Sequence, residues 1–163
     1  MNNANASVAI ADCQSEFAAL SILIPQMGMA SPVGRYLTHY SLIRACGTIE
    51  YSFKTILADF HQNMSPQLST YIDNKVRSNS CNPSYQNILS MLGDFDDNWK
   101  NNFKNQINAH PDKDRLLASL NSLNVNRNSL AHGHGSTVPF SDIKVYFDDA
   151  VQVISILDSV VVP

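Results

Sequence analysis

The residues best suited to chemistry lie between Arg127 and Gly133. This stretch places a permanently charged guanidinium, the carboxamide of Asn128 and the titratable imidazole of His132 within two helical turns. A guanidinium can hold a phosphate through two parallel hydrogen bonds, and an imidazole can transfer a proton near neutral pH. Asn128 lies one turn before His132 on the same helical face. These three groups are together suited to cleaving RNA without a metal ion.

Two long amphipathic helices are expected to position this stretch. Apolar residues recur at spacings of three and four in residues 36–61 and 141–161, which predicts helices that bury one face. A weaker helix over residues 6–24 is expected to end at Pro25, before a loop over residues 28–34. The stripe of residues 36–61 consists of Leu42, Cys46, Ile49, Phe53, Ile56 and Phe60.

Shorter helices are expected between the long ones. Ser65-Pro66 and Asn82-Pro83 each combine a capping residue with a proline suited to the first turn, and the second of these helices is expected to stop at Gly93. A further helical segment is expected from Asp96.

The helix that leads into the motif is expected to start at Pro111. Residues 124–126 are expected to interrupt or kink it, so that a second piece carries Arg127 to His132 and ends at Gly133, a natural left-handed cap residue. No segment shows the alternation of a strand. The sequence therefore predicts an all-α bundle, with residues 1–163 forming one domain.

Composition and charge exclude several classes of protein. The net charge of −3 argues against a protein that coats nucleic acid without specificity. Basic residues in one part of the sequence form either a small local basic site or a solvated helix face. These residues are Lys100, Lys104, Lys113, Arg115 and Arg127.

The cysteines and the N-terminus predict a cytoplasmic protein. Three widely spaced cysteines, an odd number without a C-x-x-C pair, suggest neither a disulfide framework nor a zinc site. Cys13 and Cys46 lie among apolar residues and are interpreted as core residues. The N-terminus lacks the basic residues of a secretory signal, and no apolar run is expected to reach the roughly 18 residues of a membrane span.

The sequence Arg127-Asn128, an apolar turn, His132 and Gly133 resembles the Arg-Asn-x-x-x-His signature of the HEPN superfamily. With the long helix before it, the glycine-containing loop after it and the terminal helix, the chain looks like a small prokaryotic HEPN protein of the ribonuclease-toxin type. The resemblance implies an antiparallel helical bundle with extra short helices that forms a homodimer. It also implies that paired Arg127 and His132 side chains, with Asn128, cleave RNA without a metal or other cofactor.

Helix geometry gives a physical reason for a dimer. Five residues along a helix turn through about 140°, so Arg127 and His132 do not share one face. Two copies related by a twofold axis would offer two of each side chain to one phosphodiester. His132 would take the proton from the ribose 2′-hydroxyl or deliver one to the leaving 5′-oxygen, while Arg127 stabilises the phosphoryl charge. DNA, which lacks the 2′-hydroxyl, would not react.

Asn128 and Glu50 are the possible supporting residues. Asn128 either orients His132 through a hydrogen bond or caps the kinked helix. Glu50 either forms an exposed salt bridge with Lys54 or, as in some HEPN proteins, faces the motif; Arg44 is a weaker candidate of the same kind.

Two other sets of side chains are weaker candidates. His132 and His134 lack a third fixed ligand, so no metal site is expected. Tyrosines at helical spacing either stack on bases or belong to the core or an interface. They are Tyr36, Tyr40 and Tyr51.

The resulting hypothesis is a metal-independent endoribonuclease, a toxin or defence effector restrained by an antitoxin or another regulatory protein. The main alternative is a catalytically silent HEPN-type module that binds RNA, nucleotide or protein. A purely structural helical adaptor is a third possibility. In that case Arg127 is a surface ion-pair partner and His132 a cation at a helix C-terminus. An arginine at a helix N-terminus opposes the helix dipole, which argues against this interpretation.

Overall fold

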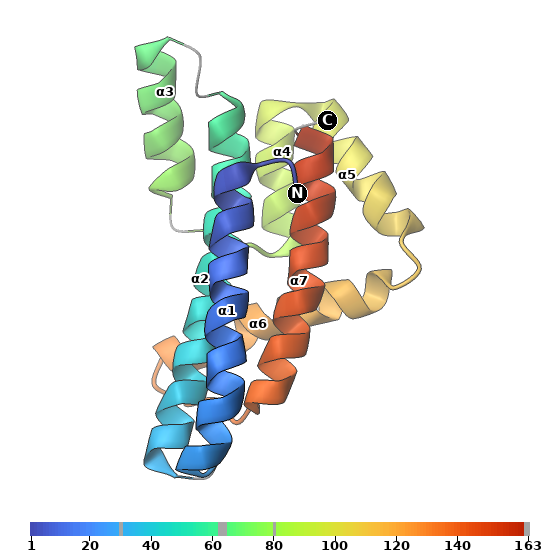
Figure 1. Ribbon diagram of the computed structural model, residues 1–163. Coiled ribbons are helices and arrows are strands. Elements are labelled where there is room, and N and C mark those ends of the chain that lie inside the picture. The colour runs from blue at the N-terminus through green and yellow to red at the C-terminus, as the bar shows by residue number, and fades with distance from the viewer. Residues whose placement is uncertain (30, 62–64, 80, 162–163) are drawn as a thin grey trace.

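A computed structural model describes residues 1–29, 31–61, 65–79 and 81–161, and this part of the chain is helical without strands. The long helices α1 (Ala4–Met27), α2 (Pro32–Phe60) and α7 (Phe140–Val161) lie side by side, and α6 (Lys113–Ala131) crosses behind them (Figure 1). The predicted all-α fold is thus confirmed for the described residues. The shorter elements are α3 (Pro66–Ile72), the π-helical turn η1 (Asp73–Arg77), α4 (Tyr85–Phe95) and α5 (Asp97–Ala109).

The core is formed by the inner faces of the long helices. The predicted stripe of α2 is buried from Leu42 to Ile56, as its spacing indicates. Phe17 of α1 meets Phe147 of α7 with ring centroids 5.3 Å apart. Phe60 is the exception in the stripe: it is 46% exposed at the end of α2, where its ring contacts Trp99 edge-on.

The junction between α1 and α2 differs from the prediction. Pro25 lies inside α1, whose end follows at Gly28. A proline there removes one helical hydrogen bond, the one its own N–H would make to the carbonyl four residues earlier, and the packing of the whole of α1 outweighs this local loss. α2 begins at residue 32, since Ser31 caps it by accepting a hydrogen bond from the Gly34 backbone at 3.0 Å. Gly34 is therefore helical, and Ala30 of the predicted loop lies outside the described residues.

Two further boundaries are corrected. α4 is capped by Ser84 rather than opened by Asn82-Pro83, and it continues past Gly93 to residue 95. α6 begins at residue 113, two residues after Pro111, and runs unbroken through residues 124–126. The amides there do not interrupt the helix, because the side chains of Asn124 and Asn126 each donate to the carbonyl four residues earlier.

α6 is held firmly against its neighbours. Leu116, Leu120 and Leu123 are buried on its inner side. The hydroxyl of Ser119 donates to the buried carboxylate of Asp149 on α7 at 2.7 Å. Because packing and this hydrogen bond act on the same face, they fix the position of α6 against α7.

α1 departs from the expectation that no segment could span a membrane. Among the described helices it alone is long and apolar enough to do so by length and composition, with a mean hydropathy of 1.4 over an 18-residue stretch. One of its faces, from Ala6 to Ile24, packs into the core. Core helices and leader segments share this composition, so it does not distinguish between them.

Candidate active site

Arg127 lies near the C-terminal end of the continuous helix α6, four residues before its last residue. A cation is favoured near this end of a helix dipole. The prediction that Arg127 starts a helix is therefore wrong, and its position no longer speaks against a surface ion pair. What distinguishes Arg127 is its set of partners, which come from two other segments of the chain.

The guanidinium of Arg127 is held by an acid and an amide. Nη2 lies 3.5 Å from Oε2 of Glu50 on α2 and donates a hydrogen bond to Oδ1 of Asn82, in the segment before α4. The Arg127 side chain is 28% exposed. It therefore keeps access to solvent while two fixed acceptors define its direction.

Glu50 is shared between two cations. Its Oε1 lies 2.5 Å from Nζ of Lys54, one turn later on α2, and its Oε2 faces Arg127. The Lys54 amine also donates to the backbone carbonyl of Asn79. The predicted salt bridge is confirmed but it is not exposed, since Lys54 is only 7% exposed. Glu50 thus pairs with Lys54 and also faces Arg127 of the motif.

Asn128 contacts Asn82 rather than His132. The Asn82 amide donates to Oδ1 of Asn128 at 3.4 Å, while the Asn128 backbone carbonyl accepts the backbone N–H of His132 at 3.0 Å. Neither predicted role of Asn128 is seen, because α6 has no kink to cap and its side chain turns to the neighbouring segment. Asn82 is a residue of the site that its sequence position does not reveal, since Asn82-Pro83 indicates only a helix start.

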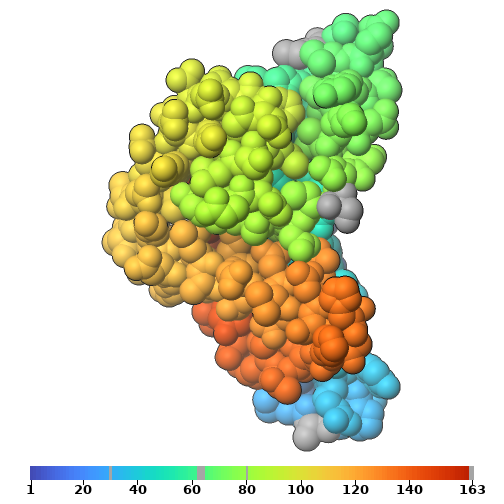
Figure 2. Space-filling view, turned by 180° about the vertical axis from the view of Figure 1, so that it is seen from behind, coloured from blue at the N-terminus to red at the C-terminus, as the bar shows by residue number. Residues whose placement is uncertain are grey.

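His132 is exposed at the C-cap of α6, and Gly133 follows with the expected left-handed φ of 78°. Within the described residues its imidazole makes no hydrogen bond and no contact with Arg127. Figure 2 shows the end of α6 and the loop after it (orange) at the surface beside α4. One chain therefore holds Arg127 in place but leaves the imidazole unengaged.

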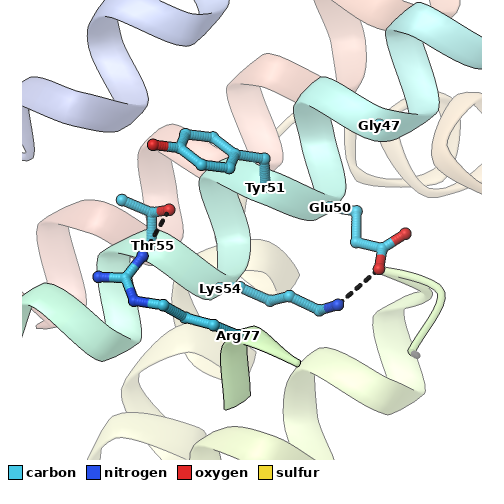
Figure 3. Close-up of a pocket in the computed structure, with 6 residues that line it drawn as sticks. All are labelled: Gly47, Glu50, Tyr51, Lys54, Thr55 and Arg77. Atoms are coloured by element: carbon cyan, nitrogen blue, oxygen red, sulfur yellow. Dashed lines mark hydrogen bonds and ion pairs between the residues drawn. The ribbon is translucent and has the colours of Figure 1, made fainter. Parts of the chain in front are cut away.

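A hollow lies along α2 beside Glu50 and Lys54 (Figure 3). It has a volume of about 280 Å³, and its cations are already paired. Arg77 donates to Thr55 and to two carboxylates, and Lys54 is bound to Glu50. The hollow is thus poorly equipped to bind an anion by itself. Its lining consists of Gly47, Glu50, Tyr51, Lys54, Thr55 and Arg77.

A sequence model of the RiboL-PSP-HEPN family matches residues 9–162 of the chain. The chain belongs to this family. No curated protein and no solved structure matches it significantly. The predicted HEPN membership is therefore confirmed. HEPN domains are often ribonucleases, which is in keeping with the residues gathered around Arg127.

Other candidate residues of this HEPN protein lie away from Arg127 and its partners Glu50 and Asn82. Arg44 forms an ion pair with Glu16 at 2.9 Å and does not face the motif. Arg115 precedes Arg127 by twelve residues, about 18 Å along α6, and pairs with aspartates. The described residues contain no group of three potential metal ligands. The three candidate tyrosines are exposed, which excludes the core interpretation for them; they are Tyr36, Tyr40 and Tyr51.

Cys46 and Cys81 lie beside the site, whereas Cys13 lies on α1 near Arg44 and Glu16. Cys46 is buried, and its thiol donates to the carbonyl of Leu123 at 3.3 Å. Burial raises the pKa of the Cys46 thiol to about 12, against a smaller opposing effect of Arg127. Burial also raises the pKa of Cys13 and of Cys81. The cysteines are therefore poor nucleophiles in the folded protein.

The pKa of Cys46 predicts a loss of stability in alkali. In the unfolded chain the thiol titrates near its ordinary value of 9.0, and in the folded chain near 12, so rising pH between these values favours unfolding. Cys46 alone is expected to remove about 1 kcal/mol from the free energy of unfolding between pH 8 and pH 10. Urea unfolding of the wild type and Cys46→Ala at both pH values measures this. Equal pH dependence in the two proteins would contradict it.

Proposed function

We propose that this HEPN protein is a metal-independent endoribonuclease that acts as a homodimer. The observation that carries the proposal is that Arg127 and His132 of the motif are held differently. Arg127 is fixed by Glu50 and Asn82, whereas His132 stands exposed on the same helix without a partner among the described residues. A guanidinium fixed in this way suits phosphate, and a free imidazole suits proton transfer.

The proposed reaction is an attack of the ribose 2′-hydroxyl on the adjacent phosphate. The oxygen–phosphorus bond that forms closes a 2′,3′-cyclic phosphate, and the bond to the 5′-oxygen breaks. His132 accepts the proton of the 2′-hydroxyl or supplies one to the leaving oxygen. Arg127 donates hydrogen bonds to the phosphoryl oxygens, where negative charge grows in the transition state.

A second copy of the chain would complete the site. α2 carries an exposed, uncharged stripe beside Glu50, and in the proposal this stripe faces the partner so that His132 of one copy approaches Arg127 of the other. A symmetric contact forms two such Arg127–His132 pairs at once. The stripe consists of Val33, Tyr36, Tyr40, Ile43, Gly47 and Tyr51.

A free ribonuclease of this kind would damage its own cell. We therefore infer that the protein is a toxin or defence effector, that it works in the cytoplasm where its RNA substrate lies, and that an antitoxin or another regulatory protein restrains it. The second candidate is a catalytically silent module that binds RNA, nucleotide or protein. It is favoured by the pairing of Arg127 with Glu50, which competes with a phosphate for the guanidinium.

The experiment that tests the proposal is RNA cleavage in EDTA. Purified wild type and His132→Ala are incubated with single-stranded RNA, structured RNA and DNA of the same sequence. Wild type is expected to cut both RNAs, to leave 2′,3′-cyclic phosphate ends and to spare DNA, because DNA lacks the attacking hydroxyl. Equal cleavage by the two proteins, or cleavage that EDTA abolishes, would contradict the mechanism. Binding without cleavage would favour the silent module.

A further inference from the structure

The side chain of Asn82 contacts both Arg127 and Asn128, the first two residues of the motif. It lies between η1 and α4, and neither its sequence position nor the proposed mechanism assigns it a role. Its Oδ1 accepts from Nη2 of Arg127, and its Nδ2 donates to Oδ1 of Asn128 at 3.4 Å. One carboxamide thus touches two consecutive residues of α6 from a segment 45 positions away.

The backbone of Asn82 is held in place from the other side. Its carbonyl accepts the backbone N–H of Ser84 and the side-chain amide of Asn87, each at 2.8 Å. The next residue, Pro83, is buried and has a restricted φ. The start of α4 therefore presents the carboxamide to α6 with little freedom to move.

The chemistry of a carboxamide matters at this position. Asn82 offers one acceptor and one donor, so it satisfies the Arg127 guanidinium and the Asn128 oxygen at the same time. An aspartate would keep the acceptor, lose the donor and add a negative charge. An alanine would remove both contacts and leave Arg127 with Glu50 alone.

Glu50 makes the neutrality of Asn82 important. Glu50 lies 3.5 Å from the Arg127 guanidinium, but it also holds the buried Lys54 at 2.5 Å, which offsets part of its charge. Arg127 is thus directed by one neutral acceptor and one shared carboxylate. Its positive charge and its remaining N–H groups stay available for a phosphate.

We propose that Asn82 is a positioning residue of the ribonuclease. It directs the Arg127 guanidinium toward the scissile phosphate and prevents a closer ion pair between Arg127 and Glu50. This inference rests on the proposed function. Asn82 acts through Arg127 and does not touch RNA itself. Its removal therefore lowers kcat and changes KM for RNA little.

The test is a double-mutant cycle in RNA cleavage. Asn82→Ala is expected to lower kcat roughly 10- to 100-fold, because a small misplacement of a catalytic group has effects of this size. In the Arg127→Ala background the same change is expected to lower the rate less than about twofold, since the group that Asn82 positions is already absent. Asn79→Ala is the matched control, because Asn79 lies in the same segment with an exposed side chain and its backbone contact to Lys54 is retained.

A second variant guards against a folding defect. Asn82→Asp has nearly the same size, and it is expected to keep the helical circular dichroism of the wild type while lowering kcat at least as much as Asn82→Ala. The added carboxylate would pair with Arg127 and compete with phosphate.

The outcomes separate the two proposals. A wild-type rate for both Asn82 variants would overturn the positioning role and leave the ribonuclease standing. An equal loss in the wild-type and Arg127→Ala backgrounds would also overturn it, because Asn82 would then act independently of Arg127. Equal rates for wild type and Arg127→Ala would overturn the ribonuclease and the role of Asn82 with it.

Discussion

Replacement of His132 by alanine is expected to reduce RNA cleavage by about two to four orders of magnitude. Replacement of Arg127 by alanine is expected to reduce it by about two to three orders of magnitude. His132 supplies or accepts the proton, and Arg127 stabilises charge that develops only in the transition state. Both variants are therefore expected to lower kcat more than they raise KM. Single-turnover cleavage of a labelled RNA in EDTA measures the effect.

The fold allows a clean comparison for both substitutions. His132 is exposed, so His132→Ala is expected to change the free energy of unfolding by less than about 0.5 kcal/mol. Arg127→Lys keeps the charge of Arg127 but loses the planar fork, and it is expected to stay well below wild-type activity. His134→Ala and Arg115→Ala are the matched controls, because His134 follows two residues later and Arg115 lies on the same helix. Normal activity in His132→Ala would refute the proposed proton transfer.

Mixing the two inactive variants is expected to restore cleavage. In the proposed dimer, Arg127 of one copy works with His132 of the other. A mixed dimer of Arg127→Ala and His132→Ala subunits therefore contains one complete Arg127–His132 pair and one pair that lacks both groups. Roughly half of the wild-type activity per dimer is the expected maximum on this symmetry argument.

The measurement needs two affinity tags, so that mixed dimers are purified from co-expressed subunits and separated from both parent forms. Each parent dimer serves as its own inactive control. An inactive mixed dimer would show that both groups must come from one chain or that every copy of both is required. A monomer of undiminished activity in gel filtration would contradict the shared site altogether.

Local patterns in the sequence account for most of the helices. The stripe from Leu42 to Ile56 predicted the buried face of α2, because periodic burial is a property of a single helix. Ser65-Pro66 predicted the start of α3 in the same way, since a cap acts within one turn. Boundaries were predicted less well: α1 continues through Pro25, and α6 continues through residues 124–126. In both cases the energetic cost at one residue is small beside the packing of the whole helix.

The site, like the helices, depends partly on local sequence and partly on tertiary packing. The sequence by itself determined the residue types of the motif, the resemblance to HEPN proteins and the five-residue separation that turns Arg127 and His132 away from each other on a regular helix. Only the tertiary structure decided that Arg127 contacts Glu50, 77 positions away, and Asn82, 45 positions away. It also decided that Lys54 is buried. These contacts join segments whose separation in sequence carries no periodic signal, because they arise only when α2, α6 and the start of α4 pack together.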